Sequence, residues 1–359
     1  MTEDQAKTVA TLLQKMLALG VSARPLAEIT VGPIVTAYRF SPEGNTRVSQ
    51  IESLASDFAV VLGVEDVVVK RMTGDSAVGI FVPNKIRTPV SFLETTKNVW
   101  RCREYAIPLN LGITQTGAPL VEDLTKLPHL LIAGTTGSGK STLLTTIVTS
   151  LLAAKTPNEV QLLLSDTKGV EFHNFIGAPH LLFPPSTSVE TTLDQMDFLI
   201  DEMNDRLKAI GHSGWKNIAQ YNQASLKAFP YIVLVIDELA DILLHRGEKR
   251  GETKIGQDKL NVLAQKARAS GIHVVAATQR PSVNIVSGSI KANFPARLTF
   301  RLPSGADSRT VLGTEGAEHL LSQGDMLYIS PNTPSIIRAH APLTLSEDIT
   351  ATLDYIVRK

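Results

Sequence analysis

Apolar and polar positions follow two different patterns along the chain, and the pattern changes near residue 105. In the first part, apolar side chains recur at helical spacing within residues 9–17, which predicts an amphipathic N-terminal helix. These side chains are Val9, Leu12, Leu13, Met16 and Leu17. The further expected elements are an alternating strand segment at 28–40, a turn at 41–45, a helix at 51–63 and short strands at 66–71 and 77–84. This mixture predicts a small α+β domain over residues 1–104.

Continuous apolar runs alternate with helical stretches over the rest of the chain. Such runs are typical of strands that are buried on both faces, and their alternation with helices predicts a doubly wound, mainly parallel sheet. The runs are PHLLIAG (128–134), EVQLLLSD (159–166), YIVLVIDE (231–238), GIHVVAAT (271–278) and PARLTFRL (295–302). The second expected domain, residues 105–359, is therefore of the α/β class.

The composition is that of a folded globular protein, with 43% apolar and 19% charged residues among 359. Lys plus Arg and Asp plus Glu both number 35, so any contact with nucleic acid has to be local. One cysteine, Cys102, excludes an internal disulfide, and no window has the length of a membrane span. These features favour a cytoplasmic protein, and the charged run at 244–254 is expected to be a solvated loop.

The strongest motif, GTTGSGKS, lies between an expected strand and an expected helix. Glycines let the backbone N–H groups of such a loop turn towards phosphates, and the helix adds the positive end of its dipole. The loop predicts an ATP site at Gly134, Thr135, Thr136, Gly137, Ser138, Gly139, Lys140, Ser141 and Thr142. Lys140 is expected to neutralise the β and γ phosphates and Ser141 to bind Mg²⁺. The alternative is a glycine-rich turn that binds nothing.

Two carboxylates, Asp237 and Glu238, end the apolar run YIVLVI. Buried acids need partners, and a hydrated Mg²⁺ is a suitable one. We expect Asp237 to belong to the metal shell and Glu238 to polarise the attacking water as the catalytic base. Alternatively, Glu238 only caps the helix that follows. Together with the phosphate loop, the acidic pair favours ATP hydrolysis over passive binding.

A family resemblance extends over nearly the whole chain. The segments LPHLLIAGTTGSGKS, SDTKGVEF, YIVLVIDELAD, KARASGIHVVAATQRP and SQGDMLYI, in this order, resemble the motor domain of the FtsK/SpoIIIE family of double-stranded DNA translocases. The segments VGPIVTAYRF and SAVGIFVPN resemble the small domain of the same family. The resemblance implies a RecA-like P-loop ATPase fold and a hexameric ring threaded by double-stranded DNA, with ATP bound between neighbouring subunits.

The resemblance also implies roles for individual residues. Arg268 matches the arginine finger, although it could merely compensate the end of a helix. Gln279 follows the strand 271–278, which we expect beside the strands that carry the loop and the carboxylates, and it suits a phosphate sensor. The expected DNA contacts match basic positions of the family and are otherwise ordinary solvated charges. They are Arg280, Lys291 and Arg309.

Two positions depart from the family pattern. Gly305 stands where many relatives have Lys, which weakens the expected binding to DNA, and Thr167 stands where Pro is usual, which is expected to change only local backbone stiffness.

Phosphate contacts carry no base information, so DNA binding is expected to be independent of sequence. The alternatives are an FtsK-like ATPase that exports polypeptides, a slow nucleotide-gated scaffold and a motor on single strands; aromatic residues, at 5%, offer no stacking series for the last.

Overall fold

The computed structural model describes residues 1–33, 35–64, 66–72, 77–86, 88–115, 117–245 and 254–358, which form two compact units. Unit 1 comprises Met1–Pro89 and Ile113–Ala118, and unit 2 comprises Val90–Gly112 and Pro119–Lys359. The chain enters unit 2 at Val90, before the boundary expected at residue 104, because α4 (Phe92–Arg101) packs on α5 (Lys140–Ala154) and belongs to unit 2. Residues 246–253 of the expected charged loop lie outside the described part.

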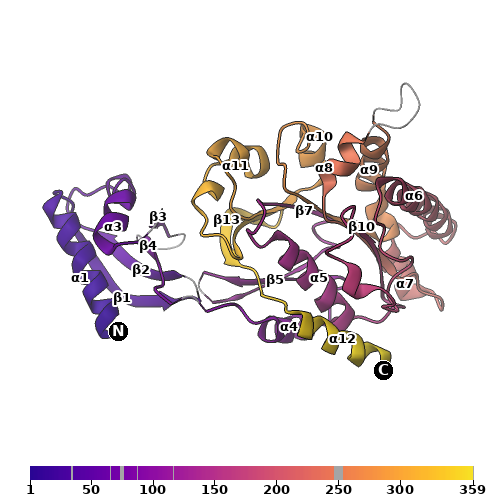
Figure 1. Ribbon diagram of the computed structural model, residues 1–359, viewed down its shortest axis with the longest axis horizontal. Coiled ribbons are helices and arrows are strands. Elements are labelled where there is room, and N and C mark those ends of the chain that lie inside the picture. The colour runs from indigo at the N-terminus through magenta and orange to yellow at the C-terminus, as the bar shows by residue number, and fades with distance from the viewer. Residues whose placement is uncertain are drawn as a thin grey trace. The chain divides into compact units, whose positions relative to one another are not determined.

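Unit 1 is a four-stranded antiparallel sheet with helices packed on it (Figure 1). Its sheet has the order β1-β2-β4-β3. Its elements are α1 (Glu3–Ala18), β1 (Ala23–Val31), β2 (Val35–Pro42), α2 (Val48–Glu52), α3 (Ala55–Leu62), β3 (Val68–Arg71) and β4 (Val78–Pro83). Leu12 and Met16 of α1 are fully buried, with Phe58 of α3 in the same core. The prediction that the N-terminal part forms a small α+β domain is confirmed.

The N-terminal elements differ from the sequence expectation in three details. Leu17 is 66% exposed, so it lies outside the apolar face of α1. The single alternating segment at 28–40 forms two strands, and Gly32 lies between them. A Cβ atom at Gly32 would lie 2.8 Å from the backbone oxygens of both Val35 and Gln115, so the close approach of the chain requires glycine. The helix expected at 51–63 is divided into α2 and α3.

Unit 2 contains a nine-stranded sheet in the order β6-β5-β13-β12-β11-β7-β10-β9-β8. The strands β11, β7, β10, β9 and β8 are all parallel to their neighbours in this group, as the apolar runs predict. The nine strands are β5 (Pro108–Thr114), β6 (Pro119–Asp123), β7 (His129–Ala133), β8 (Val160–Ser165), β9 (Tyr231–Ile236), β10 (Ile272–Thr278), β11 (Ala296–Thr299), β12 (Asp325–Ser330) and β13 (Thr333–His340).

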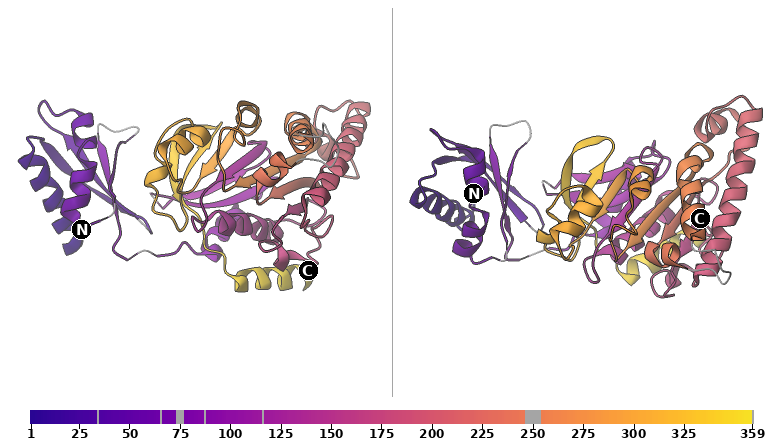
Figure 2. Two further views of the ribbon diagram at one scale, coloured as in Figure 1. Left: turned by 45° about the horizontal axis from the view of Figure 1, so that its top comes forward. Right: turned by 90° about the horizontal axis from the view of Figure 1, so that it is seen from above.

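Helices cover both faces of the parallel strands, so alternate strand residues point into two different cores (Figures 1 and 2). Leu130 and Ile132 of β7 pack in the core under α5, whereas Leu131 and Ala133 face the opposite core. This burial on both sides explains the continuous apolar runs. The remaining helices are α6 (Val189–His212), α7 (Ile218–Ala224), α8 (Leu239–Leu244), α9 (Ile255–Lys266), α10 (Gly288–Asn293), α11 (Gly305–Leu312) and α12 (Ser346–Arg358), with 3₁₀ turns at His173–Phe175, Ala267–Ser270 and Ala317–His319.

The antiparallel strands β12 and β13 extend the sheet beyond β11. The apolar runs did not predict them. Because β12 is antiparallel to β11, the turn before Asp325 lies near the C-terminal end of β11, next to the loop that follows β7. Gly324 donates its N–H to the carbonyl of Ser138 in that loop, at 2.9 Å. Among the described residues, no helix combines the length and the apolar character that crossing a membrane requires.

Candidate nucleotide and DNA site

The glycine-rich loop connects the end of β7 to α5, as expected. Gly137 and Gly139 have φ angles of 75° and 118°, in the region that favours glycine. A Cβ atom at Gly139 would lie 2.8 Å from the backbone nitrogen of Gly324, so no larger residue fits there. Ser138 also donates its hydroxyl to the carbonyl of Thr135 at 2.6 Å. The loop is thus fixed before the first turn of a 15-residue helix, whose N-terminal N–H groups can bind phosphate.

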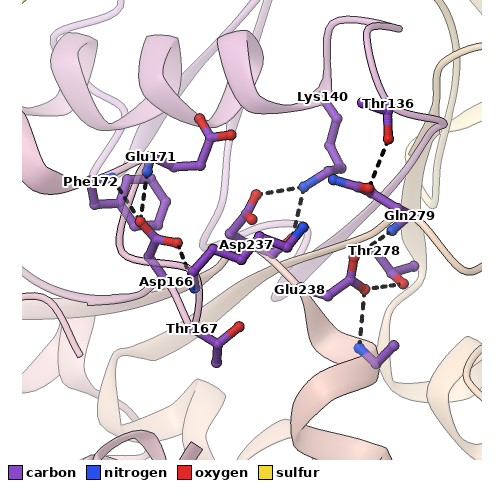
Figure 3. Close-up of polar contacts among 12 residues, drawn as sticks. Thr136, Lys140, Asp166, Thr167, Glu171, Phe172, Asp237, Glu238, Thr278 and Gln279 are labelled. Atoms are coloured by element: carbon purple, nitrogen blue, oxygen red, sulfur yellow. Dashed lines mark hydrogen bonds and ion pairs between the residues drawn. The ribbon is translucent and has the colours of Figure 1, made fainter. Parts of the chain in front are cut away.

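Lys140 and Asp237 form a buried ion pair below this loop (Figure 3). The Lys140 ammonium donates to Asp237 Oδ1 at 2.5 Å and to the Asp237 carbonyl at 2.8 Å. Their side chains are only 3% and 2% exposed, so each charge depends on the other for compensation. The pair joins the end of β9 to the start of α5 and places a cation and a carboxylate together where phosphates and a metal are expected.

Ser141 and Asp237 have the chemistry of a Mg²⁺ site. Mg²⁺ prefers oxygen ligands and is commonly held by one or two protein groups together with waters and the phosphates of the substrate. In the part of the chain that the structure describes, no cluster of three or more histidine, cysteine or acidic side chains could hold a metal by itself. One hydroxyl and one carboxylate beside a phosphate loop fit this mode of binding. A bound Mg²⁺ there would neutralise charge on the phosphates.

Glu238 is 4% exposed, and its carboxylate accepts three hydrogen bonds (Figure 3). Oε1 accepts from the Thr278 hydroxyl at 2.6 Å and from the Ala240 N–H at 3.3 Å, and Oε2 accepts from the Gln279 N–H at 3.0 Å. Glu238 is therefore the N-cap of α8, which agrees with the alternative that it caps the helix that follows. It is also joined to the end of β10, which a capping role alone does not require.

Gln279 bridges the carboxylate and the phosphate loop. The structure confirms that β10 lies between β7 and β9. The Gln279 N–H donates to Glu238, and its side-chain Oε1 accepts from the Thr136 hydroxyl at 3.0 Å. These two contacts place a neutral amide against the tip of the loop. The position suits a residue that responds to the γ-phosphate.

Sequence reasoning missed the turn that follows β8. Asp166, which is buried, accepts backbone N–H groups from four residues with its two carboxylate oxygens. The donors are Lys168, Gly169, Glu171 and Phe172. The Thr167 hydroxyl donates to Asp241 on α8 at 2.7 Å, so the expectation that Thr167 changes only backbone stiffness was wrong. An Asp followed closely by glycine after a buried strand is the signal that could have predicted this turn.

Arg268 and the phosphate loop lie at opposite ends of the parallel strands: Arg268 precedes the start of β10, whereas the loop follows the end of β7. Arg268 is exposed in the 3₁₀ turn after α9, immediately before β10 begins, whereas Gln279 follows the end of β10. Seven residues of strand separate these ends by about 20 Å. An arginine side chain cannot span that length, so Arg268 cannot reach the phosphate loop of its own chain.

Two buried histidines lie beneath Arg268, at the starts of β7 and β10. His129 Nδ1 accepts the Val274 N–H at 3.0 Å, and His273 Nδ1 lies 2.7 Å from the Pro128 carbonyl, to which it donates. Burial lowers the pKa of His129 to about 3 and that of His273 to about 4, and the charge of Arg268 adds to both effects. Both rings are neutral at physiological pH, so they place no second cation beside Arg268.

The expected DNA contacts lie on three separate segments of unit 2. Arg280 is exposed directly after β10, and Lys291 is partly exposed on α10, whose Ile290 lies in the same core as Phe294, the residue that follows the helix. Arg309 on α11 is exposed but pairs with Glu315. A Cβ atom at Gly305 would lie 3.1 Å from carboxylate oxygens of Glu315 and Glu318.

Solved structures with this fold include ATPases. The conjugation coupling protein TcpA of pCW3, in its monomer form with ATPγS, has a TM-score of 0.68 at 24% identity, covering 98% of this chain and 100% of that chain. The cytoplasmic domain of the type VII secretion ATPase EccC of Thermomonospora curvata has a TM-score of 0.62 at 23% identity, covering 74% of this chain and 34% of that chain. The fold and the loop define a RecA-like P-loop ATPase.

The sequence comparison is more specific: the chain belongs to the FtsK/SpoIIIE family, which residues 94–283 match, while residues 1–84 match the FtsK alpha domain. It is 37% identical over 363 residues to the DNA translocase FtsK of Oceanobacillus iheyensis, covering 98% of this chain and 46% of that protein. With the DNA translocase FtsK of Rickettsia prowazekii it shares 36% identity over 388 residues, covering 99% and 51%. The chain spans about half the length of these relatives.

Proposed function

We propose that this chain hydrolyses ATP and uses the energy to translocate double-stranded DNA as a subunit of a hexameric ring. The observation that carries the proposal is the path from Glu238 through Gln279 to α10. The Glu238 carboxylate, which is expected to activate water, accepts a hydrogen bond from the backbone N–H of Gln279. The chain continues from Gln279 to Arg280 and Lys291. A change at the phosphates can therefore reach residues that are candidates for binding DNA. Relatives named DNA translocase support the same function.

In this proposal, the roles at the nucleotide are divided among groups that the fold brings together. Lys140 neutralises phosphate charge, Ser141 and Asp237 bind Mg²⁺, and Glu238 activates the attacking water. Gln279 responds to the γ-phosphate through its contact with Thr136. Arg268 is 20 Å or so from its own loop by strand length, so it acts on ATP bound by the neighbouring subunit.

The net charge of zero is compatible with this function in a ring. Six copies of a few basic side chains form a positive collar around the DNA, whose axis carries about one phosphate charge per 1.7 Å. Contacts to phosphates carry no base information. DNA binding is therefore independent of sequence and weakens as salt increases.

ATP turnover with and without linear duplex DNA tests the proposal. We expect duplex to stimulate the wild-type ATPase, and Lys291→Ala to reduce the stimulation while leaving turnover without DNA close to wild type. Lys227→Ala is the matched control, because Lys227 is exposed on the loop that precedes β9, away from α10. Absence of stimulation by duplex from low to moderate salt would contradict the proposal.

A further inference from the structure

The hydroxyl group of Thr278 connects the catalytic carboxylate to the segment that is expected to contact DNA. Thr278 is the last residue of β10 and is fully buried. Its hydroxyl donates to Glu238 Oε1 at 2.6 Å and accepts the backbone N–H of Arg280 at 3.0 Å. One oxygen atom thus contacts both Glu238 and the first basic residue of the segment 279–294 (Figure 3 shows the Glu238 contact).

The hydrogen bonds of Glu238 restrict what its carboxylate can do. Each carboxylate oxygen offers two good acceptor positions. Oε1 uses both, for Thr278 and Ala240, and Oε2 uses one, for Gln279. Hydrogen bonds to a charged acceptor are among the stronger ones, and three of them fix the rotamer of the carboxylate. A general base has to turn a free lone pair towards the attacking water, which this arrangement opposes.

We propose that Thr278 is a positioning residue that restrains Glu238 until the segment beginning at Gln279 moves. The inference rests on the DNA-driven function proposed above, because DNA is the ligand that moves the segment. The Arg280 N–H and the Gln279 N–H belong to successive residues of this segment, so one backbone displacement alters the contacts of both Thr278 and Glu238. Duplex that engages Arg280 and Lys291 therefore loosens the carboxylate, and turnover increases.

The sheet offers a matched control for removing the Thr278 hydroxyl. Thr278 on β10 and Thr299 on β11 both pair with Ala133, from opposite sides of β7. Both threonines are fully buried at the end of a strand, but the Thr299 hydroxyl donates to the Phe300 carbonyl at 2.9 Å instead of to a carboxylate. Valine at either position keeps the shape of the side chain and removes the hydroxyl. Only the change at 278 affects Glu238.

The test is ATP turnover of Thr278→Val, Thr278→Ser and Thr299→Val, each with and without linear duplex DNA, with thermal unfolding recorded for each variant. Thr278→Val is expected to raise turnover without DNA about fivefold and to reduce the stimulation ratio by a similar factor. Thr278→Ser keeps the hydroxyl and should restore the wild-type ratio, and Thr299→Val should also keep it. If Thr278→Val does not fold, Thr278→Ala removes the same hydroxyl without the valine methyl groups.

A Thr278→Val protein whose turnover without DNA is not raised, or whose stimulation ratio equals that of Thr299→Val, would overturn the inference. The wild-type measurement separates this failure from that of the proposed function. A wild type that duplex does not stimulate contradicts the DNA motor, whereas a stimulated wild type with an unaltered ratio in Thr278→Val contradicts only the role of Thr278.

Discussion

Replacing Lys140 with alanine is expected to abolish ATP turnover and to destabilise unit 2 at the same time. Loss of one charge-stabilising group at a transition state commonly lowers the rate by about 10²–10³, and Lys140 is the cation of the phosphate loop. The same change leaves Asp237 buried without its partner, since the side chains are 3% and 2% exposed. Removing one member of a buried ion pair typically costs about 3–5 kcal/mol of folding free energy. Turnover and urea denaturation without nucleotide measure the two effects.

A second substitution separates the loss of activity from the loss of stability. Asp237→Asn in the Lys140→Ala protein removes the uncompensated charge, so we expect it to recover most of the free energy of unfolding while turnover stays absent. Lys227→Ala, at an exposed position, should change neither quantity by much. Normal turnover in Lys140→Ala would contradict the assigned site, and normal stability would contradict the importance of the Lys140–Asp237 pair.

Replacing Arg268 with alanine is expected to reduce turnover by about 10³–10⁵, the range known for arginine residues that stabilise phosphoryl transfer. The free energy of unfolding should change by less than about 0.5 kcal/mol, because Arg268 is exposed. Lys266→Ala is the control. Lys266 is also exposed and lies in the last turn of α9, where its charge interacts with the same helix C-terminus, but it does not match the position of the arginine finger. Equal, small effects of both substitutions on turnover would show that Arg268 only compensates the partial charge at the C-terminus of the helix.

Mixing two inactive variants tests whether Arg268 acts across a subunit boundary. The Lys140→Ala/Asp237→Asn protein lacks the phosphate site but keeps Arg268, and Arg268→Ala keeps the phosphate site. In a ring built from head-to-tail contacts, about one quarter of the interfaces in an equal random mixture combine the intact halves. We therefore expect mixing to restore ATPase activity that neither protein has alone. Persistent inactivity, with mixed assembly verified by native mass spectrometry, would argue against a shared site.

The phosphate site could be predicted from sequence because its residues are contiguous or follow strands of recognisable composition. The glycine-rich loop fixes its own backbone, and Asp237 and Glu238 directly follow the apolar run of β9. The neighbour relation of β10 also followed from the order of strands in this fold class, which placed Gln279 beside the phosphate loop. These are local signals combined with one topological expectation.

The contacts that sequence reasoning missed join residues far apart in the chain. Thr278 lies within an apolar run and looks like an ordinary strand residue, and only the pairing of β9 with β10 brings its hydroxyl to Glu238, 40 positions earlier. The bond from Thr167 to Asp241 spans 74 positions. Arg309 looked like a free cation, and the turn after α11 supplies its partner Glu315. Side-chain geometry of this kind depends on register, which composition does not determine.

Displacement of a third strand from duplex DNA tests the central claim most directly. A short triplex-forming oligonucleotide is annealed far from the end of a linear duplex, and its release is followed after ATP is added. The account predicts that the wild-type protein releases the oligonucleotide only with hydrolysable ATP, at sites of unrelated flanking sequence, and that Lys140→Ala does not. Vigorous ATP turnover in the presence of duplex without any release of the oligonucleotide would contradict it.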